Sequence, residues 1–132
     1  MNHVNVMHSM SEVVEAIIKR TGSAIVLAIP MGIGKPKHLV NALYRRVKGD
    51  PSLTLKILTA LSLERPVGHS DLEQRFLEPF AARVFGDYPD LEYVKDSRAG
   101  RLPSNINVFA FFFKTGDYLG NSRAQQNFIY SN

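Results

Sequence analysis

The segment from Ile25 to Arg46 constrains the fold of this chain more than any other stretch. An apolar run of β-forming residues is followed by a loop that contains Gly32 and Gly34, and then by an amphipathic helical pattern. In open α/β sheets, ligands bind at loops that leave the carboxyl end of a strand and begin a helix. Glycine lets the backbone approach a ligand closely, and the N–H groups of a helix's first turn favour negative charge. The segment therefore predicts a site for an anionic or carbonyl-bearing small molecule.

Two well-known phosphate loops do not match this segment. A Walker loop requires a glycine where Ile29 stands and a hydroxyl residue where Pro36 stands. The dinucleotide fingerprint begins correctly at Gly32 and Gly34, but its third glycine would fall on Lys37. An ordinary strand-to-helix turn, with Pro36 in the first helical turn, remains the alternative to a ligand site.

Positive charge is concentrated around this loop. No acid occurs from residue 21 to residue 49, and five cations fall there in addition to His38: Lys35, Lys37, Arg45, Arg46 and Lys48. The last three fit a solvated helix face, because cations near a helix C-terminus complement its dipole. Lys35 and Lys37 lie at the N-terminal end, where the dipole disfavours cations, so a bound anion is the more economical explanation.

Apolar periodicity predicts alternating helices and strands along the chain. We expect helices over about 10–20, 37–48, from Ser70 onward and from 122 to 130, and strands over 24–29, 53–58 and 106–110. Capping boxes begin at Ser9 and Ser70, and Pro79 should kink the third helix or end its regular part. The stretch from 89 to 103 reads as irregular. The continuous apolar run at 24–29 predicts a strand that is covered on both faces.

This alternation predicts an α/β fold with an open, mainly parallel sheet flanked by helices, in one domain that spans residues 1–132. In a parallel sheet, the loops after residues 29 and 58 leave at the same edge. The sequence therefore places residues 32–36 beside residues 59–62. The candidate ligand-binding residues are Gly32, Gly34, Lys35, Pro36 and Ser62.

Several stretches in addition to the glycine loop resemble the acetyl-CoA hydrolase/transferase family, which belongs to the CoA-transferases that work through a glutamyl-CoA thioester. They occur in family order, and the resemblance extends from about residue 11 to residue 132. The matching stretches are Leu58–Pro66, Arg75–Phe80, Val84–Asp90, Arg98–Pro103 and Phe111–Asn121.

The resemblance implies that the chain is the amino-terminal, substrate-side part of a longer enzyme. Family members are several times longer, and their catalytic glutamate lies in their second half, so no acid of this chain carries over to that role and we expect the chain alone to be inactive. The implied ligands are a coenzyme A thioester, as substrate rather than tightly bound cofactor, and a small carboxylate. The implied protein partner is the C-terminal half of the parent enzyme, and a homo-oligomer is possible. The residues do not distinguish hydrolysis from transfer.

The residue composition bears on which other kinds of protein and site the chain could contain. There is no cysteine, the histidines are too scattered to predict a metal site, and no signal peptide or membrane span is apparent, so we expect a cytoplasmic protein. Ser62, His69 and Asp71 are the residue types of a hydrolytic triad, but the chain lacks the glycine elbow that exposes such a serine. A net charge of +4 leaves a nucleic-acid-binding module as an alternative, although the basic run has no interleaved aromatic residues. A non-catalytic domain that binds a small anion is the third hypothesis.

Overall fold

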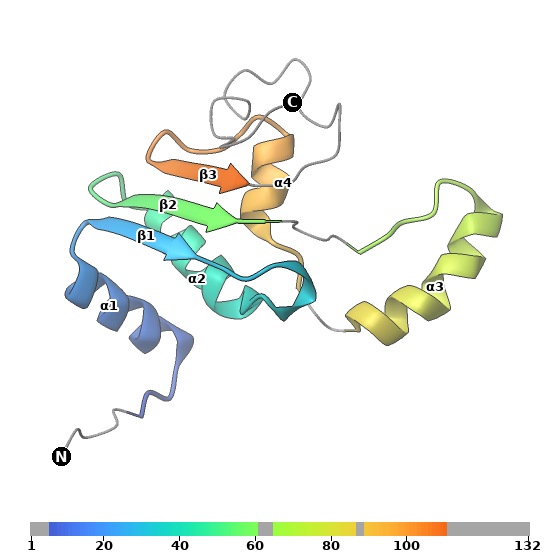
Figure 1. Cartoon of the computed structure of the whole chain (residues 1–132), viewed down its shortest axis with the longest axis horizontal. Helices are drawn as coiled ribbons and strands as arrows, with labels where there is room; N and C mark the ends of the chain where they lie inside the picture. The colour runs from blue at the N-terminus through green and yellow to red at the C-terminus, as the bar shows by residue number, and fades with distance from the viewer. Residues whose placement is uncertain (1–5, 61–64, 87–88, 111–132) are drawn as a thin grey trace.

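The computed structural model describes residues 6–60, 65–86 and 89–110, and for Ile33 the backbone alone. Helices and strands alternate along the chain (Figure 1). The elements are α1 (Met10–Thr21), β1 (Ala24–Ala28), the 3₁₀ turn η1 (Gly32–Gly34), α2 (Lys37–Lys48), β2 (Thr54–Thr59), α3 (Asp71–Phe85), α4 (Glu92–Arg98) and β3 (Ile106–Ala110). The helix predicted over residues 122–130 lies outside the described residues.

The three strands form a parallel sheet in the order β1-β2-β3. Ile25 is in register with Leu55, and Leu55 with Ile106. Parallel neighbours require crossover connections, which are supplied by α2 between the first two strands and by the segment containing α3 and α4 between the last two. The predicted α/β class with an open parallel sheet is confirmed.

The core lies on one face of the sheet. Helices α1, α2 and α4 pack beside one another against the strands, and their apolar side chains join Ile25, Leu55, Ile57 and Ile106 in one cluster. On the opposite face of β1, Val26 is 63% exposed. The prediction that this strand is covered on both faces is therefore wrong for the described part of the chain, because the helices that pack on the sheet, α1, α2 and α4, all lie on its other face.

Both predicted capping boxes are present. The hydroxyl of Ser9 accepts a hydrogen bond from the backbone N–H of Glu12 at 3.2 Å, and the carboxylate of Glu12 accepts one from the N–H of His8 at 3.0 Å. Ser70 and Glu73 repeat this arrangement at the start of α3. In each box the serine pairs an N–H group that the first turn of the helix leaves without a partner, and the glutamate binds the N–H of the residue before the cap. Of the two effects expected of Pro79, a kink or an end to the regular part of α3, the second is wrong, since the helix continues to Phe85.

Helix α4 was not expected, because residues 89–103 carry weak local signals. Leu91, its N-cap residue, provides no side-chain cap. The cap comes instead from Asn41 on α2, whose amide oxygen accepts a hydrogen bond from Glu92 N–H at 3.0 Å and whose amide nitrogen donates to Asp90 O at 2.7 Å. A helix that is capped from another element has no local sequence signature.

None of the helices in the described residues is long and apolar enough to cross a membrane.

Candidate functional site

The glycine loop connects the end of β1 to the start of α2. Gly32 has a φ of 68°, a left-handed conformation that favours glycine, and η1 turns the chain there. Among the described residues, a Cβ atom built on Gly34 would meet nothing within 4 Å. The backbone of this loop therefore faces open space at Gly34, at the carboxyl edge of a parallel sheet.

Lys35 holds this loop in place from the inside. Its side chain is buried, with an exposed fraction of 2%. The ammonium Nζ donates hydrogen bonds to Pro30 O, to Thr59 Oγ1 at 3.0 Å and to Ala60 O at 3.0 Å. Because Pro30 begins the loop and Thr59 ends β2, one side chain joins the loop to the neighbouring strand end.

The hydrogen bonds of Lys35 test the prediction that residues 32–36 lie beside residues 59–62. Residues 32–36 do lie beside the carboxyl end of β2, as the Lys35 hydrogen bonds to Thr59 and Ala60 show. The predicted neighbourhood is confirmed for those two residues. Ser62, the remaining candidate on that side, lies outside the described residues.

The sequence explains Lys35 and Lys37, at the start of α2, as cations that bind an anion. The structure gives their side chains a different place. Both Lys35 and Lys37 are buried, so neither ammonium is presented at the surface of the loop. Burial lowers the pKa of Lys35 below its ordinary value, and repulsion from Lys37 lowers that pKa further. Lys35 thus positions the loop and does not present a surface charge.

The N-terminus of α2 adds backbone donors at the same edge. Its N-cap residue is Pro36, which makes no side-chain capping hydrogen bond. Pro36 O accepts the hydrogen bond from Val40 N–H at 3.0 Å, as the first intrahelical bond requires. The side chain of His38, in this first turn, is exposed. Helix N-termini of this kind attract anions and polarised carbonyl oxygens.

The other end of α2 carries a hydrogen-bonded cluster that joins it to α4. The hydroxyl of Tyr44 donates to Asp96 Oδ2 at 2.7 Å, and Lys48 Nζ donates to the same oxygen at 2.6 Å. Burial by itself would raise the pKa of Asp96, but the hydrogen bonds from Lys48 and Tyr44 and the charges of Lys48 and Arg101 lower it below its ordinary value. Burial of Tyr44 raises the pKa of its hydroxyl, and the hydrogen bond to Asp96 and the charge of that carboxylate raise it further. Sequence reasoning missed this cluster, although Tyr44 and Lys48 are four residues apart on one helix face.

The basic run on α2 is paired with acids of the same chain. Arg45 donates to Glu92 at 2.7 Å, and Arg46 donates to Glu15 and Asp50, each at 2.8 Å. The predicted solvated helix face is thus a set of ion pairs at and near the surface. These arginines are already neutralised within the protein.

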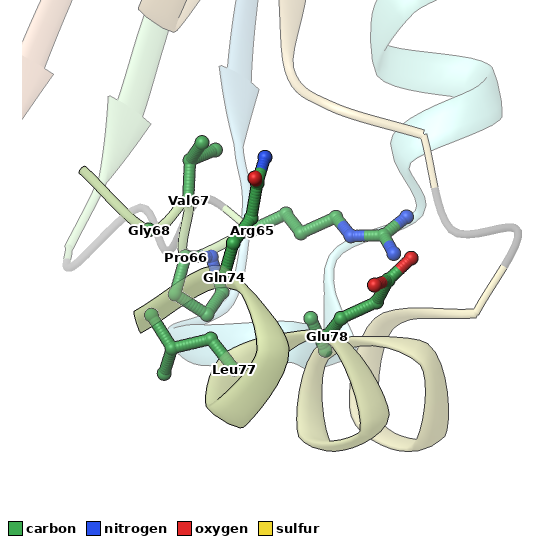
Figure 2. Close-up of a pocket in the computed structure, with 8 residues that line it drawn as sticks. Arg65, Pro66, Val67, Gly68, Gln74, Leu77 and Glu78 are labelled. Carbon is green, nitrogen blue, oxygen red and sulfur yellow. The ribbon is translucent and has the colours of Figure 1, made fainter. Parts of the chain in front are cut away.

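A separate hollow of about 170 Å³ lies between α3 and the segment before it (Figure 2). Residues 65–68 form one wall, and Gln74, Leu77, Glu78 and Ala81 of α3 form the other. A Cβ atom on Gly68 would lie 2.4 Å from the backbone nitrogen of Gln74, so only glycine allows this close approach. The lining includes no residue of the glycine loop.

Other candidates from the sequence do not assemble into a site in the described residues. No three His, Cys, Asp or Glu side chains there lie close enough together to hold a metal ion. The backbone N–H of His69 donates to Glu73, and its side chain is exposed, as expected of a loop residue before a helix cap.

The chain matches none of the protein families, curated proteins or solved structures with which it was compared.

Proposed function

We propose that this chain forms the substrate-side wall of an acyl-CoA hydrolase or CoA-transferase, as the amino-terminal part of the enzyme that its sequence resembles. The observation that carries the proposal is the glycine loop at the carboxyl edge of the parallel sheet, joined to the end of β2 by the buried ammonium of Lys35. A rigid backbone loop at that edge is the usual place for a small-molecule ligand in this fold class.

In this proposal the backbone of residues 32–34 lies against the thioester. A thioester carbonyl under attack develops negative charge on its oxygen, and fixed backbone N–H groups stabilise that charge. Gly34 lets the backbone come close because its α-carbon faces open space. The N-terminus of α2, with Pro36 at its cap, adds a favourable potential for a carboxylate or an oxyanion.

The nucleophile is not assigned to this chain. In the family that the sequence resembles, a glutamate attacks the thioester and forms a covalent intermediate, which divides one difficult step into two easier ones. No acid of this chain matches that glutamate. We therefore expect the chain to bind acetyl-CoA and not to turn it over.

Calorimetric titration of the 132-residue chain with acetyl-CoA tests the proposal, with intact-mass analysis to detect any adduct. We expect saturable binding that Gly34→Val weakens about tenfold or more, since a branched side chain would fill the space that the ligand needs. Gly49→Ala is the matched control, because the added Cβ would make only ordinary contacts, the nearest at 3.5 Å from Arg45 O. No binding to the wild type, or equal binding to Gly34→Val, would contradict the proposal. Turnover or a covalent adduct would contradict the assignment of the nucleophile elsewhere.

The same titration separates the two alternatives. A nucleic-acid-binding module would bind an oligonucleotide with an affinity that falls steeply with salt, but Arg45 and Arg46 are already paired with acids of the chain. A non-catalytic anion-binding domain would bind acetate or phosphate as well as acetyl-CoA. Competition between acetyl-CoA and each small anion distinguishes these outcomes.

A further inference from the structure

Helix α3 carries an apolar stripe that the described part of the chain leaves uncovered. The stripe consists of Leu72, Phe76, Phe80 and Val84, which are spaced four residues apart and so follow one ridge of the helix. Leu72 and Phe76 are 79% and 80% exposed, and Phe80 and Val84 are also exposed. A contiguous apolar surface of this kind marks an interaction site in a folded protein.

The position of α3 explains why the stripe faces outward. The helix stands to one side of the body formed by the sheet and the other helices (Figure 1). The face of α3 that contains Gln74, Leu77 and Ala81 is the one lined by the preceding segment, where Gly68 lies close to the helix backbone (Figure 2). Leu72 and Phe76 lie on the side of the helix opposite Gln74 and Ala81, and the stripe approaches the border of this contact at Val84, two turns after Leu77.

We propose that this stripe is the interface between two copies of the chain, in which the two α3 helices pack antiparallel about a two-fold axis. The proposal is independent of the acyl-CoA proposal above. A two-fold interface must be self-complementary, because the same surface is used by both copies. The order of the stripe meets this condition: in an antiparallel pair Leu72 faces Val84 of the other copy, and Phe76 faces Phe80.

Charge favours the same arrangement. The first turn of α3 contains Asp71 and Glu73, and its last turn contains Arg83. Antiparallel packing brings the acidic turn of one copy to the level of the basic turn of the other, and it also opposes the two helix dipoles. A parallel pair would place the acidic turns together.

The available area suits a weak, reversible contact. Fully buried phenylalanine side chains contribute about 150–250 Å² each. Because Phe80 and Val84 are only 55% and 40% exposed, two copies of the stripe bury at most about 1,000 Å² in total, which is the size of a transient protein contact. Stripes with four-residue spacing also fit the commonest packing of helix pairs, in which the ridges of one helix enter the grooves of the other.

The composition of α3 argues against a membrane surface as the occupant. Helices that lie on membranes are rich in Lys and Arg on their polar face. The helix has three acids, Asp71, Glu73 and Glu78, and two arginines. A second protein surface with matching charges is the better fit.

Sedimentation velocity over a range of chain concentrations tests the proposal. We expect reversible dimers of the full chain whose dissociation constant rises about tenfold or more in Phe76→Glu, because a charge at the centre of an apolar contact is not solvated. Val67→Glu is the matched control, since Val67 is an exposed apolar residue outside the stripe, and it should dimerise like the wild type. Circular dichroism of each variant confirms that the fold is retained.

Cross-linking tests the antiparallel register without a charge substitution. The chain contains no cysteine, so single-cysteine variants can be made directly. A mixture of Phe76→Cys and Phe80→Cys should give mainly mixed dimers with a short thiol cross-linker, and Val67→Cys should give none. Predominantly like-with-like cross-links would overturn the antiparallel arrangement. A wild type that stays monomeric at every concentration, or that associates equally well with Phe76→Glu, would overturn the interface, as would a monomer whose stripe binds anionic vesicles instead.

Discussion

Helices α2 and α3 show the same amphipathic spacing in the sequence, but the apolar face is buried in α2 and exposed in α3. Both show apolar residues at helical spacing opposite a charged face. In α2 the stripe formed by Val40, Leu43, Tyr44 and Val47 is completely buried, whereas in α3 the corresponding stripe is exposed. Amphipathic spacing thus shows that a helix has an apolar face, but it does not show what covers that face. In α2 the cover is the sheet together with α1 and α4, and for α3 we propose that it is a second copy of the chain.

A matched pair of leucines gives the largest expected difference between the two helices. Leu43→Ala in α2 should lower the free energy of unfolding by about 2–5 kcal/mol, because it leaves a cavity in the core. Leu72→Ala in α3 should change it by no more than about 0.5 kcal/mol in the monomer, since its side chain is already in water. Urea unfolding at low protein concentration measures both. Equal losses at the two positions would mean that α3 is packed as firmly as α2.

The hydrogen-bonded cluster between α2 and α4 gives the next largest effect. Tyr44→Phe removes a donor to the buried Asp96 carboxylate and should cost about 1.5–3 kcal/mol, the range for hydrogen bonds to charged groups. Folding lowers the pKa of Asp96 below its ordinary value of 3.8. The stability that this contact provides is therefore fully present at a pH above 3.8, and it is lost as the pH falls through the lower pKa of the folded protein. Acid unfolding of Asp96→Asn should consequently show a weaker dependence on pH than the wild type. An unchanged dependence would contradict the role given to Asp96.

Lys35 tests how the N-terminus of α2 is held to the sheet. Lys35→Met leaves Pro30 O, Thr59 Oγ1 and Ala60 O without the donor they share, and we expect a loss of about 1 kcal/mol at neutral pH. The folded pKa of Lys35 is lowered, so the unfolded chain holds more protons between that pKa and the ordinary value of 10.5. Wild-type stability should therefore rise with pH across this window relative to Lys35→Met. A difference between the two proteins that is constant with pH would contradict the burial of this ammonium.

Substitutions in the glycine loop should lower the free energy of unfolding by no more than Lys35→Met does. Gly32→Ala should cost about 1 kcal/mol of stability, because its φ of 68° strains any residue with a side chain. Gly34→Ala, two residues away, should be close to neutral, since a Cβ there meets nothing within 4 Å. Thermal unfolding of the two variants measures the difference. The opposite order of stabilities would mean that the turn is formed differently.

Several features of the fold could be predicted from local sequence. The bounds of α2, Lys37–Lys48, agree with the apolar periodicity, and the capping boxes at Ser9 and Ser70 form as their residue types indicate. The parallel sheet followed from the alternation of strands and helices, and its parallel order in turn placed the glycine loop beside the end of β2. These predictions succeed because each depends on residues close together in the chain or on the topology that they imply.

What the sequence by itself determined, then, is where the three strands and the helices α1, α2 and α3 lie, that the strands form a parallel α/β sheet, and that a glycine loop leaves it at the carboxyl edge. The tertiary structure alone decided that Asn41 caps α4, that the Lys35 ammonium is buried within the loop, and that the stripe on α3 is exposed while the one on α2 is covered. The physical reason is that a cap, a buried charge or a covered face depends on which groups arrive from distant parts of the chain. Local periodicity and propensity carry no information about those partners.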